Sequence, residues 1–200
     1  SETGICANAL LSLLRIFNNS SPSMFQTQSG SIATIYFDGA EYLRLISDPE
    51  LANTFKDKNT AIIASKQLVY LETYPSFYDF GNPHTVYYFQ DSQKCILNNS
   101  LQAIENNNFF KKKTNITCYF EVQPGEIYCQ FWERITGPVP SCATGVAAAW
   151  QDYSLRRQIT HGKVHTQFTQ YDVFIDNMAV CIRAVPSIVF QGHLNREHLR

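Results

Sequence analysis

The dipeptide Asp38-Gly39, set between two strand-forming stretches, constrains the fold of this chain more than any other feature. Residues 31–37 and 41–46 on either side are rich in β-branched, aromatic and other apolar side chains. Asp-Gly supplies the positive φ angles that a tight hairpin turn requires. The sequence therefore predicts a β-hairpin over 31–46.

Further strand signals follow at hairpin spacing. Two more hairpins are predicted, one pairing 85–89 with 94–97 and the other pairing 118–122 with 127–132 across a Pro-Gly turn. Single strands are predicted over 164–175 and 181–190. Pro-Gly suits the central positions of a type II turn. Many short strands with few helical stretches predict an α+β, mostly antiparallel β fold, built as one curved antiparallel sheet around a core.

The length of 200 residues fits one domain. We expect residues 1–4 to be a remnant left after removal of a signal sequence, residues 5–192 to form a single extracellular domain and residues 193–200 to form a polar tail. A chain of this length buries roughly 70% of its unfolded surface, so it can build a substantial core.

Charge and hydropathy exclude several classes of partner. The net charge of −1 provides no field that would attract nucleic acid or an anionic membrane. No apolar run reaches the roughly 18 residues of a membrane span. The hydrophobic content is 44% and the charged content 16%, a balance that suits an antiparallel β protein kept soluble by glycans.

The cysteines are spread along the chain without a CxxC pair or flanking histidines at zinc-finger spacing. An even number at wide spacing predicts three disulfides among Cys6, Cys95, Cys118, Cys129, Cys142 and Cys181, with the pairing left open. Cys118 and Cys129 lie on neighbouring predicted strands, so a bridge between them depends on the strand register.

Glycosylation sequons point to the same compartment as the cysteines. The acceptor asparagines are Asn18, Asn19, Asn98 and Asn115. Sequons together with unclustered cysteines predict a secreted or extracellular protein.

Patterns for catalysis are scarce in this sequence. It contains no Gly-x-Ser-x-Gly elbow, phosphate-binding Gly-rich loop or dinucleotide fingerprint. His161 and His165 are four residues apart but have no Glu between them, and the segment reads as extended. We therefore predict no catalytic residue, no metal, no cofactor and no enzyme. A hydrolase using His161 or His165 is the minor alternative.

The order of several short motifs resembles the ependymin-related glycoproteins, which belong to the LolA-like lipid-binding folds. Cys6 is followed by 31–39, which ends in Phe-Asp-Gly, and then by the Arg-bearing stretch 42–46. Residues 86–95 resemble the family strand that runs into a cysteine, and 185–190 resemble its late Pro-Ser-Val-Phe stretch. A family cysteine is replaced by Ala64-Ser65, so the disulfide pattern of the family does not carry over.

The resemblance implies a strongly curved antiparallel sheet, or half-barrel, with a few short helices on its concave side and a pocket for an apolar ligand. It also implies a glycoprotein that is secreted or located in the lysosomal lumen and is often a homodimer. We expect the pocket to bind a hydrophobic, lipid-like small molecule through large aromatic side chains on strands, namely Tyr36, Phe89, Phe131, Trp132 and Trp150. The alternative is a protein-interaction ectodomain, receptor-binding or adhesive, whose core is filled by the same aromatics.

Overall fold

A computed structural model describes residues 24–27, 30–37, 40–46, 75–95, 97, 100–106, 110 and 113–183, with side chains described at 44–45, 75–95, 97, 101–106, 110 and 113–183. The predicted remnant at 1–4 and the polar tail at 193–200 lie outside these residues. Within them, no helix is both long and apolar enough to cross a membrane.

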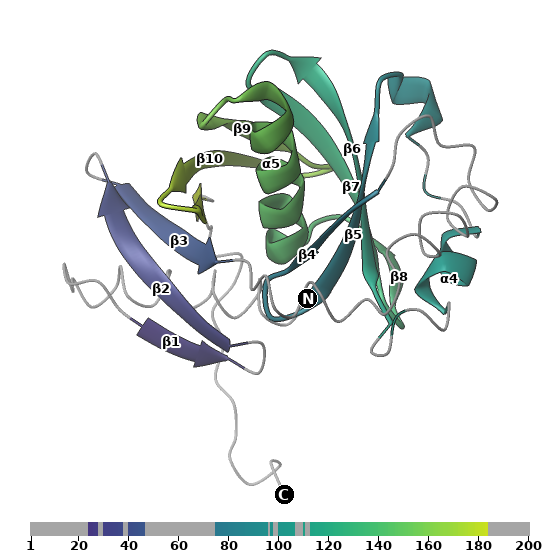
Figure 1. The fold of residues 1–200 in the computed structure, drawn as a ribbon, viewed down its shortest axis with the longest axis horizontal. Helices are drawn as coiled ribbons and strands as arrows, with labels where there is room; N and C mark the ends of the chain where they lie inside the picture. The colour runs from purple at the N-terminus through teal and green to yellow at the C-terminus, as the bar shows by residue number, and fades with distance from the viewer. Residues whose placement is uncertain are drawn as a thin grey trace, which may run out of the picture.

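Eleven strands of the described part of the chain join in one sheet (Figure 1). Its order is β1 (Met24–Thr27), β2 (Gly30–Phe37), β3 (Ala40–Ile46), β11 (Ala179–Arg183), β10 (Gln170–Asp176), β9 (His161–His165), β7 (Glu126–Glu133), β6 (Asn115–Gln123), β5 (Pro83–Phe89) and β4 (Ser76–Asp79), with β8 (Gly137–Val139) paired to β7 off this path. The sheet is open, because β1 and β4 are its two edges.

Two of the strand pairs are parallel. β5 runs parallel to β6, and β7 runs parallel to β9, while the other pairs are antiparallel. Parallel neighbours need a long crossover connection, and both connections here carry helices. The first contains η1 (Ser92–Lys94) and α4 (Ser100–Glu105), and the second contains α5 (Ala143–Arg157). The α+β class is thus correct, but the sheet is mixed rather than antiparallel.

The predicted hairpins have different outcomes. β2 and β3 pair across Asp38-Gly39, and β6 and β7 pair across Pro124-Gly125, where Gly125 has a φ of 83°. The hairpin of 85–89 with 94–97 is wrong, because a 3₁₀ turn follows β5, which pairs with β4 and β6 instead. The predicted strand over 164–175 is broken into β9 and β10 by a turn in which Thr166 N–H donates to Thr169 C=O at 2.8 Å.

α5 is a central helix that the sequence analysis did not predict. It begins after Cys142 and ends at Gln158, which takes the left-handed conformation common at helix ends. Ala147, Ala148 and Ala149 have the highest intrinsic helix propensity, and they allow strands to approach closely. Residues 144–150 are all buried, so the helix has no polar face along this stretch and shows no amphipathic period.

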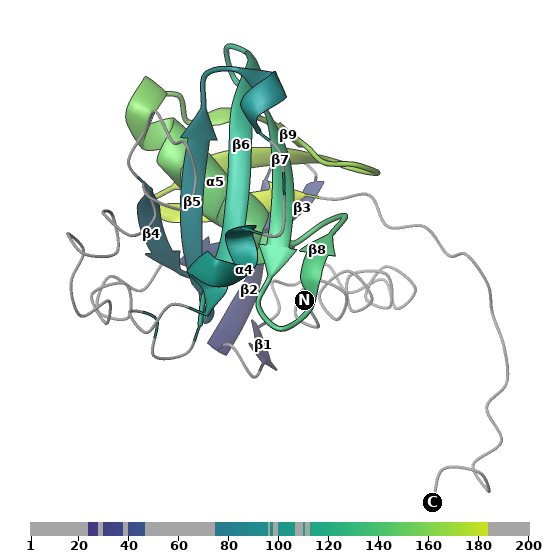
Figure 2. The same ribbon diagram turned by 90° about the vertical axis from the view of Figure 1, so that its right-hand side faces the viewer.

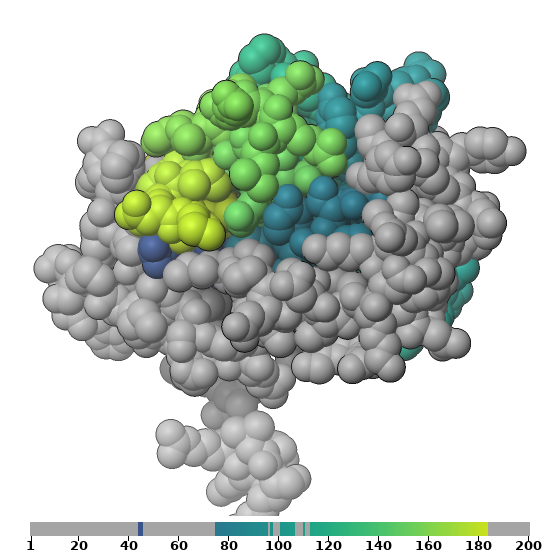
Figure 3. All heavy atoms as spheres, in the orientation of Figure 1, coloured from purple at the N-terminus to yellow at the C-terminus, as the bar shows by residue number. Residues whose placement is uncertain are grey.

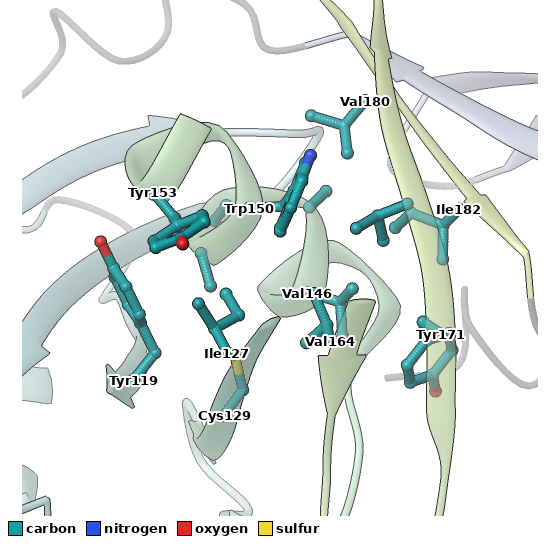
Figure 4. Close-up of a cluster of buried hydrophobic side chains, with 14 of the residues drawn as sticks. Tyr119, Ile127, Cys129, Val146, Trp150, Tyr153, Val164, Tyr171, Val180 and Ile182 are labelled. Carbon is teal, nitrogen blue, oxygen red and sulfur yellow. The ribbon is translucent and has the colours of Figure 1, made fainter. Parts of the chain in front are cut away.

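The helices divide the hydrophobic core into two layers. Figures 1 and 2 show α5 and α4 on opposite sides of β5, β6 and β7. The α5 layer is centred on Trp150 and Tyr153, and side chains from β6, β7, β9, β10 and β11 pack around them (Figure 4). The second layer lies under α4 and includes Leu101 and Ile104. Strands buried on both faces need large apolar residues at successive positions, which accounts for the aromatic content.

Candidate active site at the start of helix α5

Cys142 lies at the point where β8 leads into α5, and it is the N-cap residue of that helix. Its side chain is 3% exposed, with Sγ 3.4 Å from the Thr144 hydroxyl oxygen. Burial raises the pKa of the thiol, and the Glu133 carboxylate raises it further, against hydrogen bonds from Thr144 and the Gly145 N–H. The net effect favours a protonated thiol, which can donate a proton.

His84 connects to this thiol through Thr144. Its Nε2 lies 2.9 Å from the Thr144 hydroxyl oxygen, and its Nδ1 lies 3.4 Å from the Thr117 hydroxyl oxygen. Burial lowers the pKa of His84 to about 3, so the ring is neutral at ordinary pH. In the tautomer with the proton on Nε2, His84 donates to the Thr144 oxygen, and the Thr144 hydroxyl can then donate to the Cys142 sulfur.

A short turn between β7 and β8 brings Glu133 and Arg134 to the same end of α5. The backbone N–H of Arg134 donates to Asn115 Oδ1 at 3.0 Å. The Asn115 Nδ2 lies 3.5 Å from His84 Nε2. The buried side-chain amide of Asn115 therefore contacts both the turn and the His84 imidazole. Glu133 is close enough for its carboxylate to raise the pKa of Cys142.

Asn82 adds a buried polar atom at the start of β5, two residues before His84. The side chain is 6% exposed, and its Oδ1 has no hydrogen-bond partner among the described residues. Buried carbonyl oxygens are nearly always hydrogen-bonded, so an unpaired one needs an explanation. A ligand N–H group is a partner that would satisfy it.

Close packing fixes the first turn of α5 onto the sheet. A Cβ added to Gly145 would lie 2.6 Å from Phe131 Cδ1 and 3.1 Å from the Thr117 hydroxyl oxygen. Only glycine therefore allows this helix start to lie directly against β6 and β7. The Phe131 ring therefore packs against the first turn of α5.

The predicted pocket residues do not converge. Phe131 and Trp150 belong to the α5 layer, whereas Phe89 and Trp132 belong to the layer under α4, on the other side of the sheet. The side chain of Tyr36 lies outside the described residues. The structure thus separates the four described side chains into two cores.

The structure also differs from the expected disulfides. The described cysteines, Cys95, Cys118, Cys129, Cys142 and Cys181, are free thiols, and Cys6 lies outside the described residues. Cys118 pairs with Gln130 across the β6–β7 ladder and Cys129 pairs with Tyr119. Side chains alternate between faces along a strand, so Cys118 and Cys129 point to opposite sides of the sheet. This register prevents the bridge considered for them.

The described sequon also conflicts with glycosylation. Asn115 is 4% exposed and its amide holds Arg134, so the folded chain leaves no room for a glycan there. Asn18, Asn19 and Asn98 lie outside the described residues. His161 stacks on Phe174, and His165 Nε2 lies 2.9 Å from Glu126 Oε2, so the two histidines have separate partners.

Sequence reasoning missed Asn82, His84, Glu133 and Cys142 as site residues. The sequence analysis singled out none of the first three, and it predicted a disulfide for Cys142. The available signal was the run of small residues after Cys142, which is typical of a helix start that approaches a strand or a ligand closely.

The comparisons with known proteins point to one class of enzyme. No protein-family model matches the chain. The chain is 25% identical over 157 residues to a diaminopimelate epimerase of Halothermothrix orenii, covering 69% of this chain and 55% of that protein. It is 36% identical over 69 residues to a diaminopimelate epimerase of Methanothermobacter thermautotrophicus, covering 34% of this chain and 24% of that protein.

Solved structures show a related fold. A putative PhzC/PhzF phenazine biosynthesis protein of Clostridium difficile superposes with a TM-score of 0.58 at 13% identity, covering 97% of this chain and 72% of that one. A PhzF-family phenazine biosynthesis protein of Enterococcus faecalis gives a TM-score of 0.53 at 12% identity, covering 88% of this chain and 66% of that one. At this identity the likeness concerns the fold.

These findings overturn the ependymin and LolA resemblance and what it implied. The relatives are named as epimerases, so the predictions of a non-enzyme, a lipid-binding glycoprotein and a receptor-binding or adhesive ectodomain are wrong. The predictions of secretion and of a lipid or receptor as partner are wrong for the same reason. The amino-acid composition was misleading for a physical reason. Buried free cysteines and two cores rich in aromatic side chains give the same cysteine and aromatic content as a disulfide-bonded sheet with an apolar ligand pocket. The chain spans about half the length of the curated relatives with the longest matches, and its fold is similar to those of the two phenazine biosynthesis proteins.

Proposed function

We propose that this chain carries one half of the active site of an amino-acid epimerase, with Cys142 as an acid/base group. The observation that carries the proposal is a buried thiol at the N-terminus of a long helix, near enough to Glu133 for that carboxylate to raise the thiol pKa, and linked through Thr144 to His84. The similarity to diaminopimelate epimerases supports the reaction class and suggests diaminopimelate, or a related amino dicarboxylate, as the substrate.

The first turn of α5 provides the binding site for a carboxylate in this proposal. N–H groups at the start of a helix lack intrahelical partners, and the helix dipole favours negative charge there. A carboxylate bound to this turn would place its α-carbon near the Cys142 sulfur. The unpaired Oδ1 of Asn82 would accept a hydrogen bond from an ammonium or amide group of the same substrate.

Epimerisation breaks the Cα–H bond on one face and forms a new one on the other. A base takes the proton, the electron pair stays on the substrate as a carbanion stabilised by its carboxylate, and an acid returns a proton from the opposite side. Cys142 with its thiol protonated is suited to donate, leaving a thiolate. In the reverse direction that thiolate accepts the proton, and Thr144 and His84 keep the sulfur oriented.

The group on the other face of the substrate is assigned to residues outside those described. That assignment agrees with a chain that spans about half of its curated relatives. We further propose that 5–192 form one domain whose sheet wraps around α5 as a half-barrel, since α5 contacts β4, β5, β6, β7, β10 and β11. On the molecular surface, the green residues of the α5–β9 region lie between the yellow residues of β10 and β11 and the teal residues of β4 and β5 (Figure 3).

Exchange with solvent tests the proposal directly. The full-length protein is incubated with one stereoisomer of diaminopimelate in D₂O, and NMR follows deuterium at the α-carbon while chiral chromatography follows the isomers. We expect deuterium in the inverted product and loss of inversion in Cys142→Ala. Cys181→Ala, which changes a buried cysteine on β11, is the matched control and should retain activity. Absence of both exchange and inversion in the folded wild-type protein would reject the function.

A further inference from the structure

The turn between β7 and β8 contains a strained residue. Residues 133–136 form a β-turn in which Thr136 N–H donates to Glu133 C=O at 3.1 Å, and Ile135 has a φ of 72°. A turn with positive φ at this position favours glycine, and a β-branched residue there is an outlier. The Ile135 side chain is 83% exposed, so core packing does not hold it in place.

Glu105, the last residue of α4, accepts hydrogen bonds from both sides of this turn. Its Oε1 accepts from the Ile135 N–H at 2.8 Å and from Lys113 Nζ at 3.2 Å, and its Oε2 accepts from the Trp132 indole at 2.9 Å. Glu105 is 3% exposed. Burial opposes ionisation of Glu105, but these hydrogen bonds outweigh it and lower its pKa, so the group is an anion at neutral pH.

Two of the three residues that donate to Glu105 lie on either side of Glu133 and Arg134 in the chain. Trp132 immediately precedes this pair and Ile135 immediately follows it. The Arg134 N–H is held separately by Asn115, at 3.0 Å. Side chains from α4 and β6 therefore hold the backbone N–H groups of both central residues of the turn.

We propose that Glu105 is a positioning residue that keeps the 133–136 turn in its strained conformation and so holds Glu133 near Cys142. The proposal rests on the proposed function of Cys142 as the acid/base group. Glu105 lies in the layer on the far side of the sheet from α5, so it acts through the turn and does not touch a substrate bound at α5.

The wild-type protein provides a first test. Exposed turn amides exchange with solvent rapidly unless they are hydrogen-bonded. We expect the Ile135 amide to exchange about tenfold more slowly than an unprotected amide, as one hydrogen bond to a charged group predicts. Exchange at the unprotected rate, measured by NMR in D₂O, would contradict the hydrogen bond on which the proposal depends.

Substitution separates positioning from simple stabilisation. In Glu105→Gln the negative charge is lost and one oxygen becomes an NH₂ group that cannot accept, so the hydrogen bond from the Ile135 N–H is weakened in one amide orientation and lost in the other. We expect faster Ile135 exchange and a lower pH midpoint for titration of the Cys142 thiol, followed by the NMR shift of its Cβ, because Glu133 is no longer held near the sulfur. Trp132→Phe removes only the indole bond, so it should lower stability and leave the Cys142 midpoint unchanged.

A rescue variant completes the design. Glycine adopts a φ of 72° without strain, so Ile135→Gly added to Glu105→Gln should restore the wild-type midpoint of Cys142. If Glu105→Gln fails to fold, Ile135→Gly alone should raise the urea midpoint, and a fall would refute the strain. An unchanged Cys142 midpoint in Glu105→Gln, an equal shift in Trp132→Phe or failure of the rescue would each overturn the proposal. None of these measurements uses a substrate, so a failed epimerase assay leaves them interpretable.

Discussion

His84 Nε2 lies 2.9 Å from the hydroxyl oxygen of Thr144, and this contact ties the strand β5 to the first turn of α5. The two residues are 60 positions apart in the chain. Because both side chains are buried, the imidazole stays neutral and the hydroxyl is held in one orientation beside Cys142. The contact makes the start of the helix sensitive to changes in β5.

Acid should destabilise the protein through His84. Burial lowers its pKa to about 3 from an unfolded value of 6.5, so between these values the unfolded chain binds more protons. Stability is therefore present above pH 6.5 and is lost as pH falls toward 3, with a slope of at most about 1.4 kcal/mol per pH unit. Urea unfolding between pH 7 and 4.5 measures this slope.

Two variants identify the source of that slope. His84→Gln should reduce it, because the titrating ring is gone. The exposed His161→Gln should keep it. A slope that survives His84→Gln unchanged would assign the acid sensitivity to other groups.

Gly145→Ala should destabilise the folded state by about 1–3 kcal/mol, the usual cost of overpacking a filled core. The new methyl would lie 2.6 Å from Phe131 Cδ1. Adding Phe131→Leu removes the ring atoms in its path and should recover part of the loss. Chemical denaturation of the two variants measures both effects, and a neutral Gly145→Ala would show that β7 can move away from α5.

The described cysteines should behave as thiols. Cys95, Cys118, Cys129, Cys142 and Cys181 are free and buried, so they should react with a thiol reagent in denaturant without prior reduction. The intact mass and the urea midpoint should not change when a reductant is added. A mass increase on reduction that maps to any of these five cysteines would show a disulfide and contradict the structure.

Asp152→Asn should cost about 1–3 kcal/mol, the cost of disturbing a buried hydrogen-bond acceptor. Asp152 accepts from Tyr119 at 2.7 Å, from Tyr78 at 3.2 Å and from Arg156 at 2.6 Å. Burial, reinforced by Asp152, raises the pKa of both tyrosines, so they remain neutral donors.

The matched control for Asp152→Asn is Asp172→Asn. Asp172 pairs with Arg183 across 3.6 Å, and both side chains are partly exposed. Such pairs contribute at most about 1 kcal/mol, so this variant should unfold close to wild type. An equal loss of unfolding free energy in the two variants would mean that the buried hydrogen bonds of Asp152 stabilise the fold no more than an exposed ion pair does.

Local signals in the sequence determined the elements whose partners lie close along the chain. The hairpins across Asp38-Gly39 and Pro124-Gly125 formed as predicted, because turn residues and flanking strand formers set the pairing within a few residues. The strand-rich α+β class followed from the same signals.

Only the tertiary structure decided the parallel pairings and the site. β5 meets β6, and β7 meets β9, after long crossovers whose pairing no local pattern specifies. Residues 144–150 of α5 are all buried, so the period that identifies an amphipathic helix was missing there. His84, Asn115 and Cys142 come together because the sheet packs on this helix, and a buried polar residue gives no sign in the sequence of which distant residue will be its partner.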